Sequence, residues 1–265
     1  MDTICRDMES EYQELDDVVS SLDMKEWNLD TPFYRWTIFD EIAHIAFFDH
    51  EALLAVDMPD YFKARSRNIM QILKSNDDWP AYTNILLGPE QPNSLLLLWR
   101  KTRTALINRL SRMDPRDRIL WYGPDMSVRS FATARLMETW AHGQDVFDAL
   151  RLQRTYTHRL LHVAHIGVTT FAWSFKIRKL SPPETEIRVE LTGPGGELWT
   201  WGDPEALEQV HGSAEDFCLV VTQRRNFADT RLECRGVHVT KWLSIAQAFA
   251  GIQQNPPAPG ERVID

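Results

Sequence analysis

Apolar residues recur at intervals of three and four through the first half of the chain, which is the spacing of amphipathic helices. In residues 37–56, Ile38, Ile42 and Ile45 share one side, and Thr37 stands where it can cap the helix. Prolines and glycine mark 75–93 as a loop. The other helices that this periodicity predicts in the first half are 2–24, 60–74, 94–113 and 127–150. We therefore expect a helical bundle here.

The pattern changes after residue 180, where alternating apolar and polar positions indicate β-strands. Residues 158–178 still have helical spacing, which Pro182 and Pro183 then interrupt. The elements expected after them are strands at 187–191 and 197–201 that form a hairpin, a helix between Ser213 and about residue 224, a third strand within 230–238, a helix at 239–250 and a loose tail at 255–265. This order predicts a small α+β domain at 156–265 after a helical domain at 1–155.

Composition and charge narrow the classes of function. Of the 265 residues, 43% are hydrophobic and 25% are charged, a globular balance that suits one large or two modest domains. A net charge of −9 without a dense basic stripe argues against nucleic acid and anionic membranes as partners. No apolar stretch approaches the roughly 18 residues of a membrane span, and the acidic N-terminus is unlike a signal peptide. The three cysteines are widely spaced, which suits a reducing compartment, so we expect a cytoplasmic protein. Apolar helix faces permit a homodimer as well as a monomer.

The clearest candidate chemistry lies in the helix expected at 127–150. Glu138 and His142 are four residues apart, so they share a helix face and can converge on one ion. Asp145 lies three residues further along that face, where it could hold the second imidazole nitrogen of His142. Ionisable side chains on a largely buried helix are costly unless they are paired or bind a metal.

A third ligand must come from another segment, and His44 is the candidate. It has apolar neighbours in the helix expected at 37–56, and facing helices of a bundle can bring it opposite Glu138 and His142. Two histidines and a carboxylate suit catalytic zinc, or iron and other divalent ions. Taken one at a time, such residues are more often surface pairs or hydrogen-bonded core histidines. A weaker candidate for a second metal site is the cluster of His158, His162 and His165.

Two motifs resemble the signatures of a known family. The segment 36–46, WTIFDEIAHIA, resembles the WTvxDvxaHla signature of the DinB-like, mycothiol-dependent maleylpyruvate isomerase superfamily. The segment 137–146, METWAHGQDV, resembles its second signature, mEtWaHgxDv, and residues 212–225 are similar to the C-terminal segment of two-domain members. The resemblance implies a DinB-like four-helix bundle followed by a small, sterol-carrier-like α+β domain, within a metal-binding subgroup of the superfamily.

The resemblance also implies a site and its chemistry. The ligands that it implies for zinc are His44, Glu138 and His142. Iron(II), nickel(II) and manganese(II) are alternatives to zinc. In the isomerases an arginine of the second domain reaches the site, and Arg224 best matches that position, with Arg225 as the fallback. A guanidinium there can hold a substrate carboxylate by two hydrogen bonds. We therefore expect a metal-dependent isomerase or transferase for a small carboxylated molecule, with a low-molecular-weight thiol as cosubstrate and Asp145 orienting His142.

Two other interpretations stay open from the sequence. The same metal could serve a hydrolase, or a lyase or isomerase of secondary metabolism, that uses no thiol and takes Glu51 or another carboxylate as its base. Alternatively, the protein is no enzyme: the second domain binds an apolar ligand beside Trp199 and Trp201, and the metal only stabilises the fold. Removing the metal distinguishes a catalytic role from a structural one.

Overall fold

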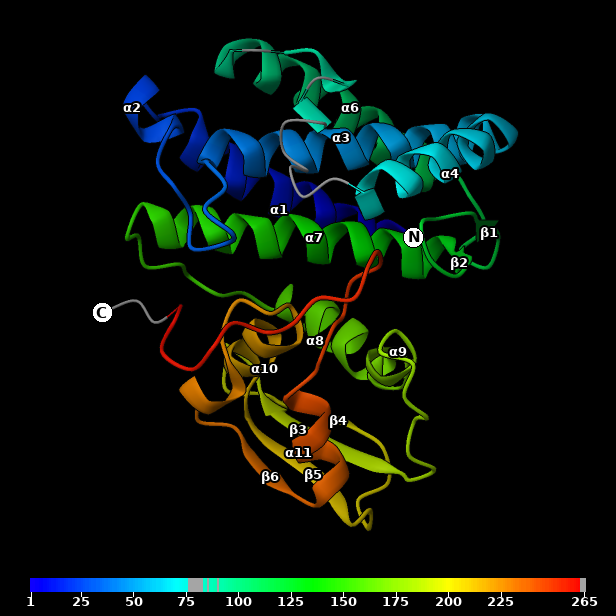
Figure 1. Ribbon diagram of the computed structural model, residues 1–265, viewed down its shortest axis with the longest axis vertical. Coiled ribbons are helices and arrows are strands. Elements are labelled where there is room, and N and C mark those ends of the chain that lie inside the picture. The colour runs from blue at the N-terminus through cyan, green and yellow to red at the C-terminus, as the bar shows by residue number, and fades with distance from the viewer. Residues whose placement is uncertain (76–82, 85, 90, 263–265) are drawn as a thin grey trace. The chain divides into compact units, whose positions relative to one another are not determined.

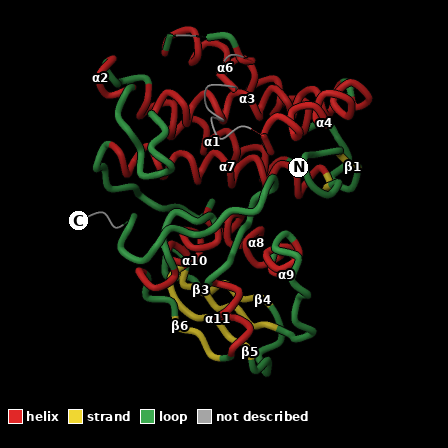
Figure 2. The backbone as a smooth tube through the Cα atoms, in the orientation of Figure 1, coloured by secondary structure: helices red, strands yellow, loops and turns green. Residues whose placement is uncertain are grey.

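The computed structural model describes residues 1–75, 83–84, 86–89 and 91–262. It forms two compact units, Met1–Leu152 and Gln153–Asp265. The first unit is helical and the second is a small sheet with helices (Figures 1 and 2). The predicted fold class, a helical bundle followed by an α+β region, is therefore confirmed. The assignment of separate functions to 1–155 and 156–265 stays a prediction.

Four helices form the bundle of the first unit. They are α1 (Asp2–Val19), α3 (Ile38–Asp57), α6 (Pro92–Leu110) and α7 (Val128–Ala149). Helices α3 and α7 pack against each other, α6 packs on α3, and α1 packs on both α6 and α7 (Figure 1). Outside the bundle lie α2 (Met24–Trp27), α4 (Pro59–Ser75) and a small hairpin of β1 (Arg118–Ile119) and β2 (Met126–Ser127). In the part of the chain that the structure describes, no helix combines the length and apolarity needed to cross a membrane.

Local signals set where these helices begin. The hydroxyl of Thr37 accepts a hydrogen bond from the backbone N–H of Asp40, so the predicted cap of α3 is confirmed. The helix predicted over 2–24 is shorter, because α1 ends at Val19 and α2 starts separately after Asp23, whose carboxylate caps it. The predicted loop at 75–93 lies mostly outside the described residues.

The core of the bundle is apolar on all four helices. Each fully buried aliphatic or aromatic side chain contributes about 1.5–3 kcal/mol relative to exposure. Among those with 2% exposure or less are Met8, Leu15, Ile42, Ile45, Trp99, Leu106, Leu136 and Trp140. Helix α7 is buried on nearly every side, polar residues included. Ionisable side chains on α7 therefore need partners inside the protein.

The second unit places a mixed sheet beside four helices. The helices are α8 (Leu160–Thr169), α9 (Phe171–Lys176), α10 (Ala214–Val221) and α11 (Val237–Leu243), with a short 3-10 turn at Phe227–Asp229. The strands are β3 (Ile187–Thr192), β4 (Leu198–Trp201), β5 (Glu208–Ser213) and β6 (Glu233–Arg235), in the order β4-β3-β5-β6 (Figure 2). The predicted β3–β4 hairpin is confirmed, and β5 pairs in parallel with β3.

Three predictions for this half were wrong in detail. Strand β5 was not expected, because Val210 is its one buried apolar residue, between half-exposed Gln209 and His211, and gives little apolar signal. The helix predicted at 158–178 is broken at Thr170, where the backbone leaves helical geometry. The helix predicted at 239–250 begins earlier and already ends at Leu243.

The tail predicted to be loose is bonded to the second unit as far as residue 262. The amide of Asn226 donates to the carbonyl of Pro257 at 2.6 Å. The guanidinium of Arg262 donates to the carbonyl of Gln223 at 2.9 Å. These long side chains hold an irregular backbone in place without forming a helix or a strand.

Candidate metal centre

Helices α3 and α7 bring the three predicted ligands together. One ligand atom from each of His44, Glu138 and His142 lies within 4.8 Å of the other two. The Nε2 atom of His142 is 3.4 Å from a carboxylate oxygen of Glu138, and the imidazole centroids of His44 and His142 are 4.4 Å apart. The four-residue spacing on α7 places Glu138 and His142 on one face, as the sequence indicated. Their role as metal ligands stays a prediction.

The sequence did not identify the carboxylate that lies closest to His142. A carboxylate oxygen of Glu41 is 2.6 Å from the Nδ1 atom of His142. The other oxygen of Glu41 accepts a hydrogen bond from the hydroxyl of Thr31 at 2.7 Å. Asp145, the residue predicted to orient His142, lies 3.7 Å from the same Nδ1 atom, beyond hydrogen-bonding distance. Glu41 is fully buried and precedes His44 by one turn of α3, and that spacing is the signal that could have revealed it.

The contact with Glu41 decides what the other ring nitrogen of His142 can do. If Nδ1 carries the proton and donates it to Glu41, then Nε2 presents a lone pair to the carboxylate of Glu138. Two acceptors 3.4 Å apart repel each other unless a cation lies between them. Two ligands bound at about 2.1 Å to a tetrahedral ion are themselves about 3.4 Å apart. The nitrogen and oxygen donors therefore fit zinc, and they also suit iron(II), manganese(II) and nickel(II).

Aromatic rings surround the two histidines. The Trp36 ring lies parallel to the imidazole of His142, with the two ring centroids 5.9 Å apart. Its centroid is 5.1 Å from the centroid of the His44 imidazole. Phe33 meets His142 edge to face at 5.3 Å, and Phe48 lies 4.7 Å from His44. His142 is buried, whereas His44 and Glu138 are only half-buried. The candidate site is thus apolar around its buried histidine and accessible beside the other two ligands.

The loop that carries Phe33 and Trp36 has an unusual backbone. Tyr34 and Arg35 adopt φ angles of 52° and 59°, in the left-handed region. Such residues cost on the order of 1–3 kcal/mol each when they are not glycine. A hydrogen bond of 2.6 Å from the N–H of Thr31 to the carbonyl of Trp36 closes the loop. No sequence signal marks this conformation, since neither left-handed residue is glycine.

Glu51, the base considered for a thiol-independent reaction, is already engaged. Its carboxylate accepts hydrogen bonds from Arg65 at 2.8 Å and from the hydroxyl of Tyr122 at 2.6 Å. Burial by itself raises the pKa of Glu51, but the neighbouring His50 and the hydrogen bonds from Tyr122 and Arg65 outweigh burial and hold the pKa below its usual value. A weakly basic, fully buried carboxylate is a poor general base at neutral pH.

The other residues singled out by sequence lie in the second unit. Among the described residues, the sets that could share one ion are the candidate ligands and the group of Glu41, His142 and Asp145. Neither set includes His158, His162 or His165. His165 instead accepts a hydrogen bond from the indole N–H of Trp201 at 3.3 Å. Trp199 is half-buried on β4, and a ligand pocket beside these tryptophans stays a prediction.

The two arginines proposed to bind a substrate acid follow α10. Arg224 is 2% exposed, and its guanidinium donates to the carbonyl of Thr222 at 2.8 Å. Arg225 donates to the carbonyl of Arg224 at 2.9 Å. The backbone N–H groups of both arginines donate to the carbonyl of Leu219, which ends α10 tightly. Their role at a substrate stays a prediction.

Comparison with known proteins adds a family to this geometry. Residues 8–147 match the family model of the mycothiol maleylpyruvate isomerase N-terminal domain. Two proteins of Mycobacterium tuberculosis described as uncharacterized, from strains CDC 1551 and H37Rv, are each 42% identical to the chain over 259 residues, which is 96% of both chains.

Two solved structures share the fold of the chain. The crystal structure of the mycothiol-dependent maleylpyruvate isomerase superposes with a TM-score of 0.51 at 15% identity, over 96% of this chain and 94% of that one. The crystal structure of a histidine-to-alanine mutant of that isomerase gives 0.50 at 14% identity, over 82% and 85%. At these identities the likeness extends to the fold only.

Proposed function

The chain belongs to the family of the mycothiol maleylpyruvate isomerase N-terminal domain, and from this premise we propose that it is a metal-dependent enzyme that uses a low-molecular-weight thiol. Its substrate is a small carboxylated molecule, and the reaction is an isomerisation or an S-transfer. The observation that carries the proposal is the convergence of His44, Glu138 and His142 from two helices to within 4.8 Å. Zinc is the first candidate for the ion.

The residues around the proposed ion each have a definite task. A divalent ion bound there lowers the pKa of a thiol or polarises a carbonyl. Glu41 keeps the proton of His142 on Nδ1 and so keeps Nε2 available as a ligand. Trp36 and Phe33 limit the access of water to His142. The half-buried His44 and Glu138 leave a side on which thiol and substrate can arrive.

A thiol makes isomerisation of a conjugated double bond possible. The thiolate adds to one carbon, forming a carbon–sulfur bond while the electron pair of the double bond moves toward the conjugated carbonyl. Rotation about the resulting single bond follows, and the electron pair then returns to expel the thiolate and restore the double bond. Atoms and electrons balance without an oxidant or reductant. Arg224 is the proposed partner of the substrate carboxylate, because a guanidinium can bind it by two hydrogen bonds.

The support for a thiol comes from the relatives. The family is named for mycothiol, and the solved enzyme of the same fold is described as mycothiol-dependent. A thiol-independent hydrolase or lyase is less well supported, because Glu51 is bonded to Arg65 and Tyr122 and its pKa is lowered. Maleylpyruvate with mycothiol is therefore the first reaction to assay.

Elemental analysis of the purified protein tests the proposal directly. We expect about one equivalent of zinc or another divalent metal in the wild type, and its loss in His44→Ala and in His142→Ala with the helical content unchanged. The matched control is His50→Ala, an exposed histidine of the same helix, which should keep the metal. A well-folded wild type that binds no metal after reconstitution overturns the proposal.

Activity measurements then separate the reaction classes. Turnover that needs both metal and thiol supports the proposal. Turnover with metal but no thiol would replace it with a thiol-independent hydrolase or lyase. A protein that melts when the metal is removed and turns over no assayed acid, with or without thiol, would instead favour a binding protein with a structural metal.

A further inference from the structure

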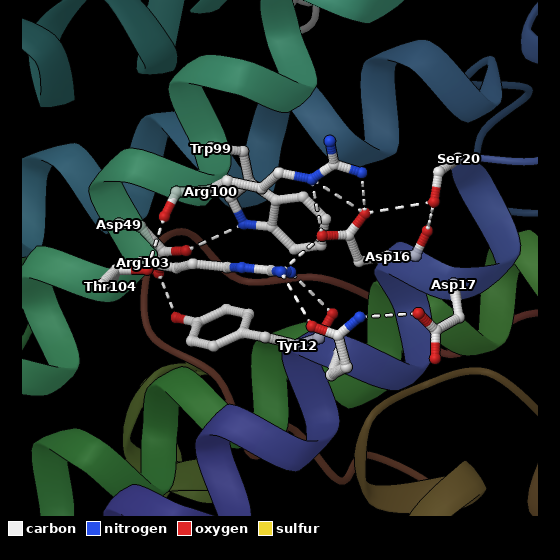
Figure 3. Close-up of polar contacts among 10 residues, drawn as sticks. Tyr12, Asp16, Asp17, Ser20, Asp49, Trp99, Arg100, Arg103 and Thr104 are labelled. Carbon is white, nitrogen blue, oxygen red and sulfur yellow. Dashed lines mark hydrogen bonds and ion pairs between the residues drawn. The ribbon is translucent and has the colours of Figure 1, made fainter.

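One buried carboxylate joins all four helices of the bundle. Asp49 on α3 accepts a hydrogen bond from the hydroxyl of Tyr12 on α1 at 2.7 Å, and one from the indole N–H of Trp99 on α6 at 3.2 Å (Figure 3). The guanidinium of Arg135 on α7 donates to Asp49 at 3.0 and 3.1 Å. Helices α1, α3, α6 and α7 thus meet at a single side chain.

The ion pair of Asp49 and Arg135 is almost completely removed from water. Asp49 is 0% exposed and Arg135 is 3% exposed. Burial raises the pKa of Asp49, against the opposing influence of Arg135. Buried ion pairs of this kind often add no stability, and apolar residues of similar volume can replace them at little or no cost. Stability alone therefore does not account for a charged pair at this position.

The position of the pair relative to the candidate ligands suggests another role. On α7, Arg135 stands one helical turn before Glu138. On α3, Asp49 stands about one and a half turns after His44. A second contact, from Arg135 to the carbonyl of Ile45 at 3.5 Å, also joins α7 to α3. The pair connects the same two helices that supply the candidate metal ligands.

We propose that Asp49 and Arg135 are positioning residues that set how α3 and α7 lie along each other, and thereby hold His44 opposite Glu138 and His142. The inference rests on the proposed metal centre, which it deepens. Apolar side chains could pack in the same space at several relative positions of the helices. The guanidinium of Arg135 instead directs two N–H groups at one oxygen, Oδ1 of Asp49, and this charged, directional contact favours one relative position of the helices.

The bundle offers a matched pair for comparison. Asp16 on α1 is 2% exposed and forms ion pairs with Arg100 and Arg103 of α6 (Figure 3). Arg103 also packs over the Trp99 ring, 4.6 Å from its centroid. Neither α1 nor α6 carries a candidate ligand. A change there disturbs a buried ion pair in the same bundle and leaves Asp49 and Arg135 in place, although Arg103 contacts Trp99 and Tyr12, the other two donors to Asp49.

The experiment compares two apolar double variants in the full-length chain. One is Asp49→Leu with Arg135→Met, and the control is Asp16→Leu with Arg103→Met. Cobalt(II) is titrated into each metal-free protein and its visible absorption is recorded. We expect the first variant to fold and to bind cobalt about 10-fold or more weakly than the wild type, with a changed spectrum, as for other residues that support metal ligands. The control should keep the affinity and the spectrum of the wild type.

A second readout needs no metal. The 2.6 Å contact of Glu41 with His142 also joins α3 to α7, so it senses the same alignment. In metal-free wild type we expect a slowly exchanging, downfield Nδ1–H proton signal that is absent from His142→Ala. The signal should shift or broaden in the Asp49/Arg135 variant and stay unchanged in the control. This readout keeps the inference testable even if the wild type binds no cobalt. Absence of cobalt binding in the wild type would overturn the proposed metal centre but not the alignment of α3 and α7.

Two results overturn the positioning role. One is a folded Asp49/Arg135 variant with the cobalt affinity and the His142 signal of the wild type. The other is an equal loss in the control, which would indicate a general effect of buried charges. If the apolar variant does not fold, Asp49→Asn with Arg135→Gln decides, since it keeps neutral hydrogen bonds between the helices. Weaker cobalt binding or a shifted His142 signal in that variant supports the proposal. If neither of these two changes is observed, the proposal is overturned.

Discussion

At the scale of single residues, the imidazole of His142 is held between two carboxylates. Glu41 is 2.6 Å from Nδ1, and Glu138 is 3.4 Å from Nε2. The short contact fixes the ring and the long one leaves space for an ion. This asymmetry distinguishes Glu41, which contacts the ring directly, from Glu138, the proposed ligand, although both are glutamates.

The first prediction concerns which carboxylate orients His142. Glu41→Gln should weaken zinc binding by about 10-fold or more, because a neutral amide supports the ligand less well than a carboxylate. Asp145→Asn should have a smaller effect, since Asp145 lies 3.7 Å from Nδ1. Competition titrations with a chromogenic chelator measure both affinities. A larger loss in Asp145→Asn would restore the role that the sequence suggested for Asp145.

The second prediction concerns the substrate acid. Arg224→Lys should raise KM for a carboxylated substrate with a smaller change in kcat, because lysine cannot form the two parallel hydrogen bonds of a guanidinium. Arg225→Lys is the control and should leave KM nearly unchanged. Steady-state kinetics with substrate and thiol varied separately measure the effect. A raised KM in Arg225→Lys alone would transfer the role to Arg225.

At the scale of elements, the sequence identified three side chains that the structure brings together, because they lie in long helices that the sequence pattern predicts. On α7 the four-residue spacing of Glu138 and His142 places both on one face, and a hydroxyl caps α3 at Thr37. The left-handed turn at Tyr34 and Arg35 gave no signal, because tertiary contacts and not residue type enforce it. Glu41 was overlooked because a glutamate in a first helical turn is ordinary, although it precedes His44 by one turn of the same helix.

The third prediction concerns the stability of the helix contacts at high pH. Burial first, and then the neighbouring charge of Asp49, raise the pKa of Tyr12 well above its usual value. Between the pKa of an unfolded tyrosine, about 10, and this raised value, the unfolded chain releases a proton that the native protein keeps. Stability should therefore fall as the pH rises through this range, and it should fall less steeply in Tyr12→Phe.

Urea unfolding midpoints measured from pH 8 to pH 11 test this expectation. At pH 8 the Tyr12→Phe protein should be less stable by about 1–2 kcal/mol, because Asp49 loses a buried donor. Tyr61→Phe, at an exposed tyrosine, is the control and should follow the wild type. Parallel pH profiles of wild type and Tyr12→Phe would contradict the role given to Tyr12.

At the scale of the whole molecule, the bundle does not depend on an ion for its core. Its helices are held by apolar packing, and the buried carboxylates of Asp16 and Asp49 are paired with arginines of the bundle itself. The fourth prediction is that a chelator lowers the melting temperature but leaves the helical circular dichroism at 25 °C unchanged. Zinc added at a concentration of about 100 times its Kd should then raise the free energy of unfolding by about 2.7 kcal/mol. Loss of helical structure on chelation would contradict this expectation.

The parallel pairing of β3 with β5 has a consequence for how the second unit folds. The β3–β4 hairpin closes over a short turn and can form early, on a timescale of microseconds. Strand β5 pairs with the other edge of β3 and runs in the same direction, so it has no turn to guide it and must find a β3 already positioned by the hairpin. Refolding followed by hydrogen-exchange labelling should therefore protect the amides of β4 before those of β5. The strands would then join the sheet in their order along the chain, and the central pairing, between β3 and β5, would form late.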